Sequence, residues 1–218
     1  MKELNMKICV LGKISTNCYI LYRKETTGEA LSPAVVIDPG DNAPYIHNCC
    51  KELGIRPTAI LLTHGHFDHI LAAEELRRTY HIPIYACETE ERLLELPEIN
   101  LSSAFGEPVF LTADYLLRDG QELDLLGVDW KVITTPGHTA GSLCYWIPTE
   151  GVLLSGDTLF HESMGRTDLP TSSSASICHS ILDKLFLLPE ETKVYPGHGD
   201  STTIAHEKQY NPAVAYKA

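Results

Sequence analysis

The stretch from residue 59 to residue 76 constrains the fold most, because it joins an apolar strand to a helix through a cluster of polar side chains. Ala59-Ile60-Leu61-Leu62 has the pattern of a buried strand, and residues 70–76 have the pattern of a helix. Between them stand four side chains that bind metals elsewhere: His64, His66, Asp68 and His69. Imidazole and carboxylate groups on the loop that follows a strand are typical of a metal site.

Three later segments place a further donor just beyond an apolar strand. His138 follows Thr134-Thr135-Pro136-Gly137, Asp157 follows Leu154-Ser155-Gly156, and His198 follows Tyr195-Pro196-Gly197. Glycine beside each donor lets the backbone approach closely, so the four segments are predicted to converge on one rim. The four ligands of the first cluster would fill the coordination sphere of a single metal. If two metals share them, each metal needs further ligands, which His138, Asp157 and His198 can supply. A carboxylate can bridge two cations about 3.5–4 Å apart.

Short strands and helices alternate along the chain, with turns such as Thr26-Thr27-Gly28 between them. Strands are predicted at 8–11, 18–22, 34–37, 59–62, 83–86, 121–126, 129–134, 143–147, 152–155 and 193–195. Helices are predicted at 42–53, from the 64–69 cluster to about 80, at 88–96, 176–188 and 202–208, with 100–108 irregular. Two packed sheets with outer helices would satisfy this order, and so would one doubly wound sheet.

Composition excludes several classes of partner. The 218 residues suffice for one domain or two small ones, and no linker divides them. A net charge of -12 argues against nucleic acid, whose phosphates require basic surfaces. We find no signal peptide and no membrane span. The seven cysteines lack CxxC spacing, so we expect reduced, buried or half-buried thiols and a cytoplasmic protein.

The ordered set of seven donors resembles that of the metallo-β-lactamase superfamily, over roughly residues 5–211. The resemblance implies an α/β (α+β) fold, the four-layer αβ/βα sandwich, with residues 1–218 as a single domain. It further implies two metal sites that share Asp157 as a bridging ligand. The first would be held by His64, His66 and His138, and the second by Asp68, His69 and His198.

Within the superfamily, residues 155–160 and 164–168 are most similar to glyoxalase II, in particular to the short bacterial hydroxyacylglutathione hydrolase-like group. The chain is too short for the C-terminal helical domain of full-length glyoxalase II. Arg166 falls at a basic substrate-binding position, although a salt bridge to Asp168 is an equal interpretation. Asp168 stands where glyoxalase II has tyrosine, and Asp157 disfavours the lactamase branches.

The resemblance implies hydrolysis of a small-molecule thioester such as S-D-lactoylglutathione by a hydroxide bridging two divalent metals, with Asp68 orienting it. Zinc is the first expectation, and the ligands also suit iron or manganese. Three alternatives stay open: a persulfide dioxygenase with a single iron, a lactone hydrolase, and a non-catalytic metal-binding or redox-sensing module. Tyr19, Tyr145 and Phe160 are expected to pack in the core rather than line a pocket. The remaining histidines are expected on the surface or in packing contacts: His47, His81, His161, His179 and His206.

Overall fold

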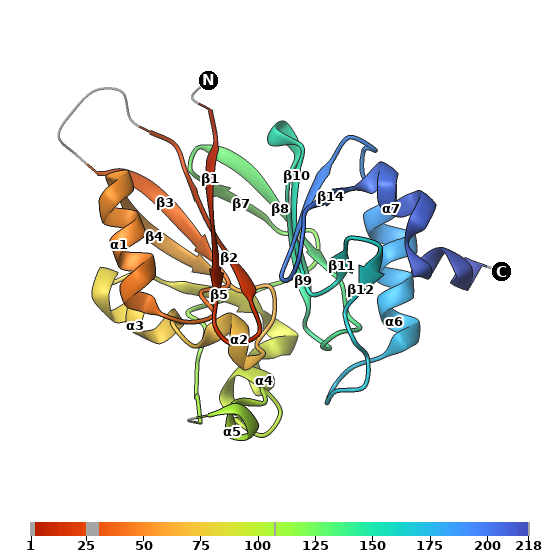
Figure 1. Cartoon of the computed structure of the whole chain (residues 1–218), viewed down its shortest axis with the longest axis horizontal. Coiled ribbons are helices and arrows are strands. Elements are labelled where there is room, and N and C mark those ends of the chain that lie inside the picture. The colour runs from red at the N-terminus through yellow and green to blue at the C-terminus, as the bar shows by residue number, and fades with distance from the viewer. Residues whose placement is uncertain (1–2, 25–30, 107, 218) are drawn as a thin grey trace.

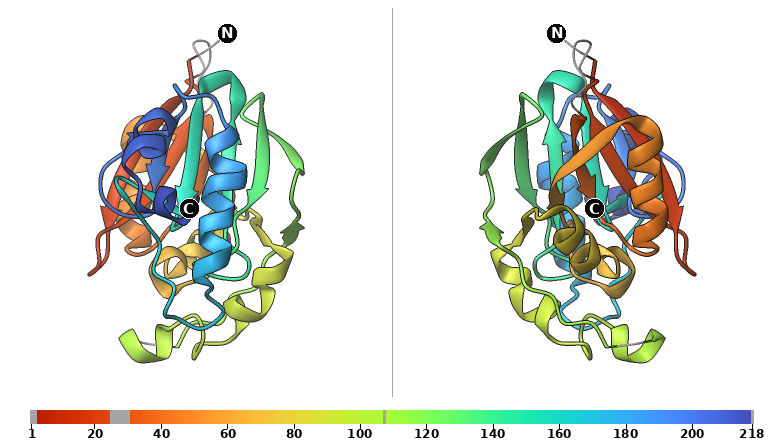
Figure 2. Two further views of the ribbon diagram at one scale, coloured as in Figure 1. Left: turned by 90° about the vertical axis from the view of Figure 1, so that its right-hand side faces the viewer. Right: turned by 90° about the vertical axis from the view of Figure 1, so that its left-hand side faces the viewer.

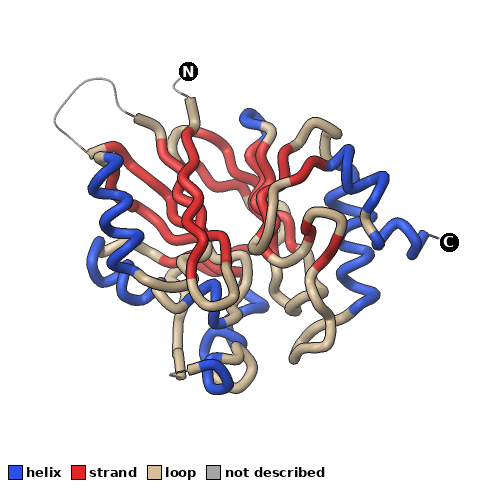
Figure 3. Tube along the Cα trace, in the orientation of Figure 1, coloured by secondary structure: helices blue, strands red, loops and turns tan. Residues whose placement is uncertain are grey.

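Two sheets lie face to face at the centre of the molecule, with helices on the outer side of each (Figure 1). The structure, a computed structural model, describes residues 3–24, 31–106 and 108–217. The turn expected at 26–28 lies outside these residues. Figure 3 shows the strands gathered in the middle and the helices at the two sides and along the lower rim.

The first sheet has the order β1-β2-β3-β4-β5-β6. Its first three strands are antiparallel neighbours, and β3 to β6 run parallel. Every residue of β2 is buried, as expected for a strand covered on both faces. The strands are β1 (Asn5–Leu11), β2 (Thr16–Tyr22), β3 (Ser32–Ile37), β4 (Ile55–Leu61), β5 (Ile84–Cys87) and β6 (Tyr115–Leu117).

The second sheet has the order β14-β13-β10-β9-β8-β7, in which only β10 and β13 run parallel. A separate two-stranded hairpin, β11–β12, follows β10. The strands are β7 (Glu122–Leu125), β8 (Val128–Thr134), β9 (Leu143–Ile147), β10 (Val152–Gly156), β11 (Leu159–Phe160), β12 (Ser163–Met164), β13 (Lys193–Pro196) and β14 (Thr202–Thr203).

The helices divide into two outer layers and a group at the rim (Figure 2). α1 (Ala43–Leu53) and α3 (Ala73–Tyr80) belong to the first sheet, and α6 (Ser174–His179) and α7 (Ile204–Tyr210) to the second. α6 continues through a π-helical turn (Ser180–Lys184) and a 3-10 turn (Leu185–Leu187). Shorter elements are α2 (Phe67–Ile70), α4 (Glu91–Glu95), α5 (Ser102–Phe105) and the 3-10 turns Glu88–Glu90, Pro148–Glu150 and Pro212–Lys217.

Three apolar clusters hold these layers together. The first lies between the first sheet and α1 and α3, and includes Ile20, Val36 and Leu76. The second fills the space between the sheets, and the third joins the second sheet to α6 and α7. Alternating side chains of one strand serve different clusters, since Ile20 faces the helices while Leu21 faces the other sheet. The four-layer αβ/βα sandwich is therefore confirmed, and the doubly wound alternative is wrong.

Several local predictions differ from the structure. Residues 102–105 form α5, although this region was expected to be irregular. Thr202 and Thr203 pair with β13 before α7 begins, because strand pairing overrides the helical pattern there. The short strands β6, β11 and β12 carry too few residues for a pattern. All seven cysteines are free and buried, as predicted. No helix among the described residues is long and apolar enough to cross a membrane.

Candidate metal centre

The seven predicted donors lie together at one edge of the two sheets. His64 follows β4, Asp68 and His69 lie on α2, and His66 precedes that helix. His138, Asp157 and His198 follow β8, β10 and β13 of the second sheet. The centre is thus built from loops of both sheets, on segments that are far apart in the chain.

Ligand atoms within 4.8 Å of one another form three overlapping groups. One group is His64, His66 and His138; another is Asp68, His69 and His198; the third is His64, His69 and Asp157. In the first, His66 Nδ1 lies 2.9 Å from His138 Nε2. In the second, His198 Nε2 and His69 Nε2 each lie 3.2 Å from Asp68 Oδ2.

Asp157 lies between the first two groups. Its Oδ2 is 3.5 Å from His138 Nε2 and 3.5 Å from His198 Nε2, and its Oδ1 is 3.4 Å from His69 Nε2. A carboxylate in this position can bind a cation on either side. The division of seven ligands between two metals remains a prediction, and this geometry suits it.

The donors fit a metal chemically. Four of their buried atoms have no hydrogen-bond partner among the described residues: Nε2 of His64, His66 and His69, and Oδ1 of Asp157. A buried polar atom without a partner is costly, so each is suited to a cation. Two other ring nitrogens are already engaged, because His69 Nδ1 lies 2.9 Å from Asp38 Oδ2 and His138 Nδ1 lies 2.9 Å from the Arg166 carbonyl. Such bonds orient the opposite nitrogen toward a metal.

Burial and charge favour the protonation states that bind metals at His64, His66 and Asp68, whereas at His69 they favour the protonated ring. Burial, aided by neighbouring imidazoles, lowers the pKa of His64 well below its usual range and that of His66 to about 3. Burial would raise the pKa of Asp68, but His69 and His198 outweigh it and hold the pKa far below normal. Burial would lower the pKa of His69, but nearby carboxylates, Asp68 foremost, raise it. A cation would displace that proton.

Asp38, at the end of β3, is a residue that the sequence reasoning missed. Its Oδ2 accepts hydrogen bonds from the Thr63 hydroxyl at 2.6 Å and from the His69 ring, and its Oδ1 accepts the Thr63 backbone N–H at 2.8 Å. It therefore fixes both the His69 ring and the start of the His64 loop. In the sequence, Asp38-Pro39-Gly40 marks the end of the strand predicted at 34–37, and an acidic residue at a strand end is the one local signal for this role.

Glu90 is a second residue that the sequence reasoning missed. It is 1% exposed, and its two carboxylate oxygens accept the backbone N–H groups of Gly65 and Gly141, each at 2.9 Å. One glycine lies between His64 and His66, and the other lies in the loop that carries His138. Glu90 thus ties the two loops that form the first ligand group. In the sequence it sits among charged residues and resembles an exposed helix face.

Close backbone approach at the centre requires glycine at Gly197. A Cβ there would lie 2.1 Å from Asp157 Oδ1 and 2.8 Å from the His69 ring. The prediction that glycine brings the donor segments together is confirmed here.

A cavity of about 560 Å³ opens over the donors. Its lining includes Phe160, Met164 and Arg166. The prediction that Phe160 packs in the core is therefore wrong, whereas Tyr19 and Tyr145 are buried as expected. The Arg166 side chain forms a bidentate ion pair with Asp168, at 2.6 and 2.7 Å. A role for Arg166 in substrate binding remains a prediction.

Sequence comparison adds independent information. The family description "Metallo-beta-lactamase superfamily" matches residues 11–198. An uncharacterised protein of Mycobacterium leprae is 39% identical over 212 residues, covering 92% of this chain and 94% of its own length. The probable metallo-hydrolase YqgX of Bacillus subtilis is 36% identical, with 93% of each chain covered. Hydroxyacylglutathione hydrolase GloC of Haemophilus influenzae is 31% identical, with 99% and 100% covered.

Solved structures share the fold. The BLEG-1 B3 metallo-β-lactamase superposes with a TM-score of 0.88 at 41% identity, covering 95% of this chain and 98% of that one. TTHA1623 in a di-iron-bound form superposes with a TM-score of 0.81 at 34% identity, covering 94% of this chain and 98% of that one. ETHE1 from Myxococcus xanthus superposes with a TM-score of 0.78 at 28% identity, covering 98% of this chain and 86% of that one. With its sandwich fold, its donor set and these matches, the chain belongs to the metallo-β-lactamase superfamily.

Proposed function

We propose that the chain is a binuclear metal-dependent hydrolase of small-molecule thioesters, with S-D-lactoylglutathione as the reference substrate. The observation that carries the proposal is the place of Asp157, whose carboxylate contacts both ligand groups below an open cavity. The similarity to a hydroxyacylglutathione hydrolase over 99% of the chain supports the choice of thioesters.

One cation would be held by His64, His66 and His138, and the other by Asp68, His69 and His198. Asp157 would bind both cations. When bound, two divalent cations supply Lewis acidity and lower the pKa of a water shared between them. Zinc suits this nitrogen and oxygen ligand set, and the di-iron form of TTHA1623 supports iron as the alternative.

The chain's own groups would orient the reaction. The Thr16 hydroxyl donates to Asp68 Oδ2 at 2.7 Å, which fixes the carboxylate that we assign to orienting the nucleophile. A thiol leaving group has a pKa near 8.5, so its departure needs no strong general acid.

The decisive experiment combines elemental analysis with hydrolysis assays. We expect about two metals per chain, hydrolysis of S-D-lactoylglutathione, and loss of hydrolysis in Asp157→Ala with the fold retained. Persistence of hydrolysis in that variant would contradict the two-metal mechanism. A β-lactam and a homoserine lactone serve as competing substrates, the first because of the similarity to BLEG-1. Faster turnover of either would replace the thioester assignment.

Persulfide dioxygenation is a second candidate, favoured by the group His64, His69 and Asp157. Two histidines and one carboxylate are the ligand set of many non-haem iron(II) oxygenases. Oxygen uptake with glutathione persulfide, by protein that carries one iron per chain, would favour this reaction over hydrolysis.

For partners and location we propose a small-molecule substrate, no nucleic-acid or membrane partner, and the cytoplasm. The net charge of -12 and the seven free thiols support these assignments.

A further inference from the structure

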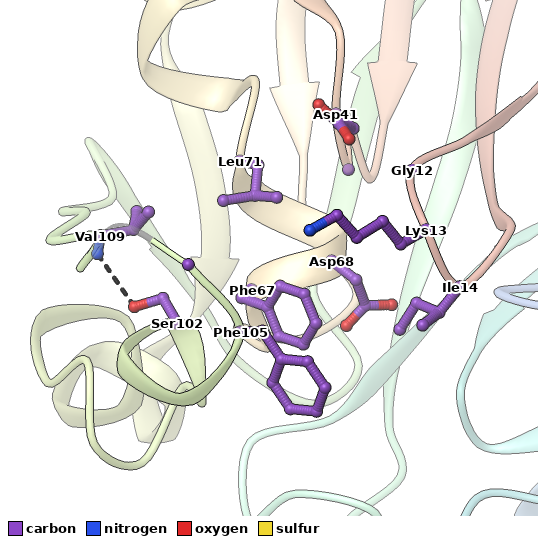
Figure 4. A pocket seen from close by; sticks show the side chains of 12 residues that line it. Gly12, Lys13, Ile14, Asp41, Phe67, Asp68, Leu71, Ser102, Phe105 and Val109 are labelled. Carbon is purple, nitrogen blue, oxygen red and sulfur yellow. Dashed lines mark hydrogen bonds between the residues drawn. The ribbon is translucent and has the colours of Figure 1, made fainter.

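A second cavity, of about 350 Å³, opens beside the metal centre (Figure 4). Ile14, Phe67, Asp68 and Phe105 line both this cavity and the one over the donors, so the two adjoin each other. We call the second cavity the Lys13 groove, because Lys13 extends across it from the turn between β1 and β2.

The walls of the Lys13 groove are apolar and open to solvent. Ile14 is 45% exposed, Leu71 39% and Phe105 57%, which is unusual for large apolar side chains gathered in one place. Phe105 also stacks on Phe67, with ring centroids 4.6 Å apart and planes within 9°. An exposed apolar surface that continues into a reactive site is a mark of a ligand-binding groove.

Among the residues that the structure describes, the charged groups lining the groove are Lys13, Asp41 and Asp68. Asp68 is committed to Thr16 and the donor histidines, and Asp41 Oδ1 accepts the Asn42 backbone N–H at 2.6 Å. No ion pair joins Lys13 to a carboxylate within the part of the chain that the structure describes. The Lys13 ammonium is therefore available to an anionic ligand, while Asp41 opposes one.

We propose that the Lys13 groove binds the acyl arm of the substrate, and that this arm is an apolar chain ending in a carboxylate held by Lys13. The inference rests on the proposed thioester hydrolysis. The thiol carrier is assigned to the larger cavity, which Arg166 also lines, because a glutathione-like carrier is bulkier than a short acyl chain. The preferred substrates are then ω-carboxyacyl thioesters rather than neutral acyl thioesters.

Matched substrates test the proposal. Hexanoyl and adipoyl thioesters of N-acetylcysteamine have the same chain length, and only the second ends in a carboxylate. Wild type should show a KM for the adipoyl thioester about two- to fivefold lower, as expected for an exposed charge pair, with similar kcat. Lys13→Met should abolish this preference and Lys13→Arg should keep it. Asp41→Asn should strengthen it, and Lys51→Met, an exposed lysine of α1, is the control.

Phe105→Ala should raise the KM of both thioesters alike, because it removes an apolar wall without changing charge. Equal KM values for the two thioesters in wild type, or the same preference in Lys13→Met, would overturn the proposal.

Binding measured without turnover separates this inference from the proposed function. Calorimetry would use the thioether S-(5-carboxypentyl)-N-acetylcysteamine and its terminal amide, neither of which can be hydrolysed. Tighter binding of the carboxylate that depends on Lys13, in a protein that hydrolyses no thioester, would uphold the groove and refute the hydrolase. Thioester hydrolysis together with ligand binding that does not depend on Lys13 would uphold the hydrolase and refute the role of the groove.

Discussion

Replacement of Glu90 by glutamine is the most informative perturbation of the metal centre, because it changes one atom and almost no volume. In the native protein both carboxylate oxygens accept a buried backbone N–H, from Gly65 and from Gly141. Glutamine keeps one acceptor and turns an NH₂ group toward the other N–H. One buried donor is then left without a partner.

An unsatisfied buried donor costs about 1–3 kcal/mol. We therefore expect Glu90→Gln to lower the free energy of unfolding by about 2 kcal/mol. For a chain of this size that corresponds to a fall in Tm of roughly 4–8 °C. Since Glu90 joins the loops that carry His64 and His138, metal affinity should also fall, by about 10- to 100-fold, as for other groups that orient ligands.

Denaturation followed by circular dichroism would measure the first effect, and competition with a chelator the second. Glu91→Gln is the matched control, because Glu91 is the next residue along and is exposed. If Glu90→Gln and Glu91→Gln unfold at the same denaturant concentration and bind metal equally well, the argument that Glu90 ties the two loops would be refuted.

Three further predictions concern two residues at the centre, Asp38 and Gly197, and one buried thiol of the second sheet, Cys144. Asp38→Asn weakens the partner that orients His69, so chelator competition should show metal affinity reduced by about 10- to 100-fold with little change in circular dichroism. Gly197→Ala would place a Cβ 2.1 Å from Asp157 Oδ1, and elemental analysis should show lower metal occupancy than in wild type. Burial raises the pKa of Cys144 to about 11, so this thiol should resist alkylation at pH 8 until the protein is denatured. Because the unfolded thiol ionises from about pH 9 and the folded thiol only near 11, stability should fall as pH rises through that interval, which alkaline denaturation would measure.

The sequence predicted the parts of the centre that depend on local pattern. His138, Asp157 and His198 each follow an apolar strand with glycine adjacent, and that combination was sufficient to group them with the first cluster. The order of predicted strands and helices did not distinguish two packed sheets from one doubly wound sheet, because both arrangements bury the same strands. The two-sheet arrangement was predicted from the resemblance to the metallo-β-lactamase superfamily.

What the sequence did not reveal are contacts made only by the folded chain. Asp38 and Glu90 act on backbone N–H groups that lie 25 residues or more away, so no local spacing marks them. The strands of two or three residues exist because a neighbouring strand pairs with them, and such pairing overrides local propensity. Phe160 was expected in the core because aromatic residues usually are buried, yet its strand ends at the cavity.

The metal centre and the choice of substrate depend on different parts of this molecule. The donors are held by buried polar contacts between loops, including the bonds from Asn17 Nδ2 to the carbonyls of Pro196 and Gly199, and the bond from the Tyr19 hydroxyl to Pro196. Removing one partner of such a contact leaves a buried group unsatisfied, so these residues can change little without loss of metal. Lys13 and Phe105 are exposed and make none of these hydrogen bonds, so they can vary at less cost to stability. Members of the superfamily can therefore keep one metal centre and differ in the substrate that they accept.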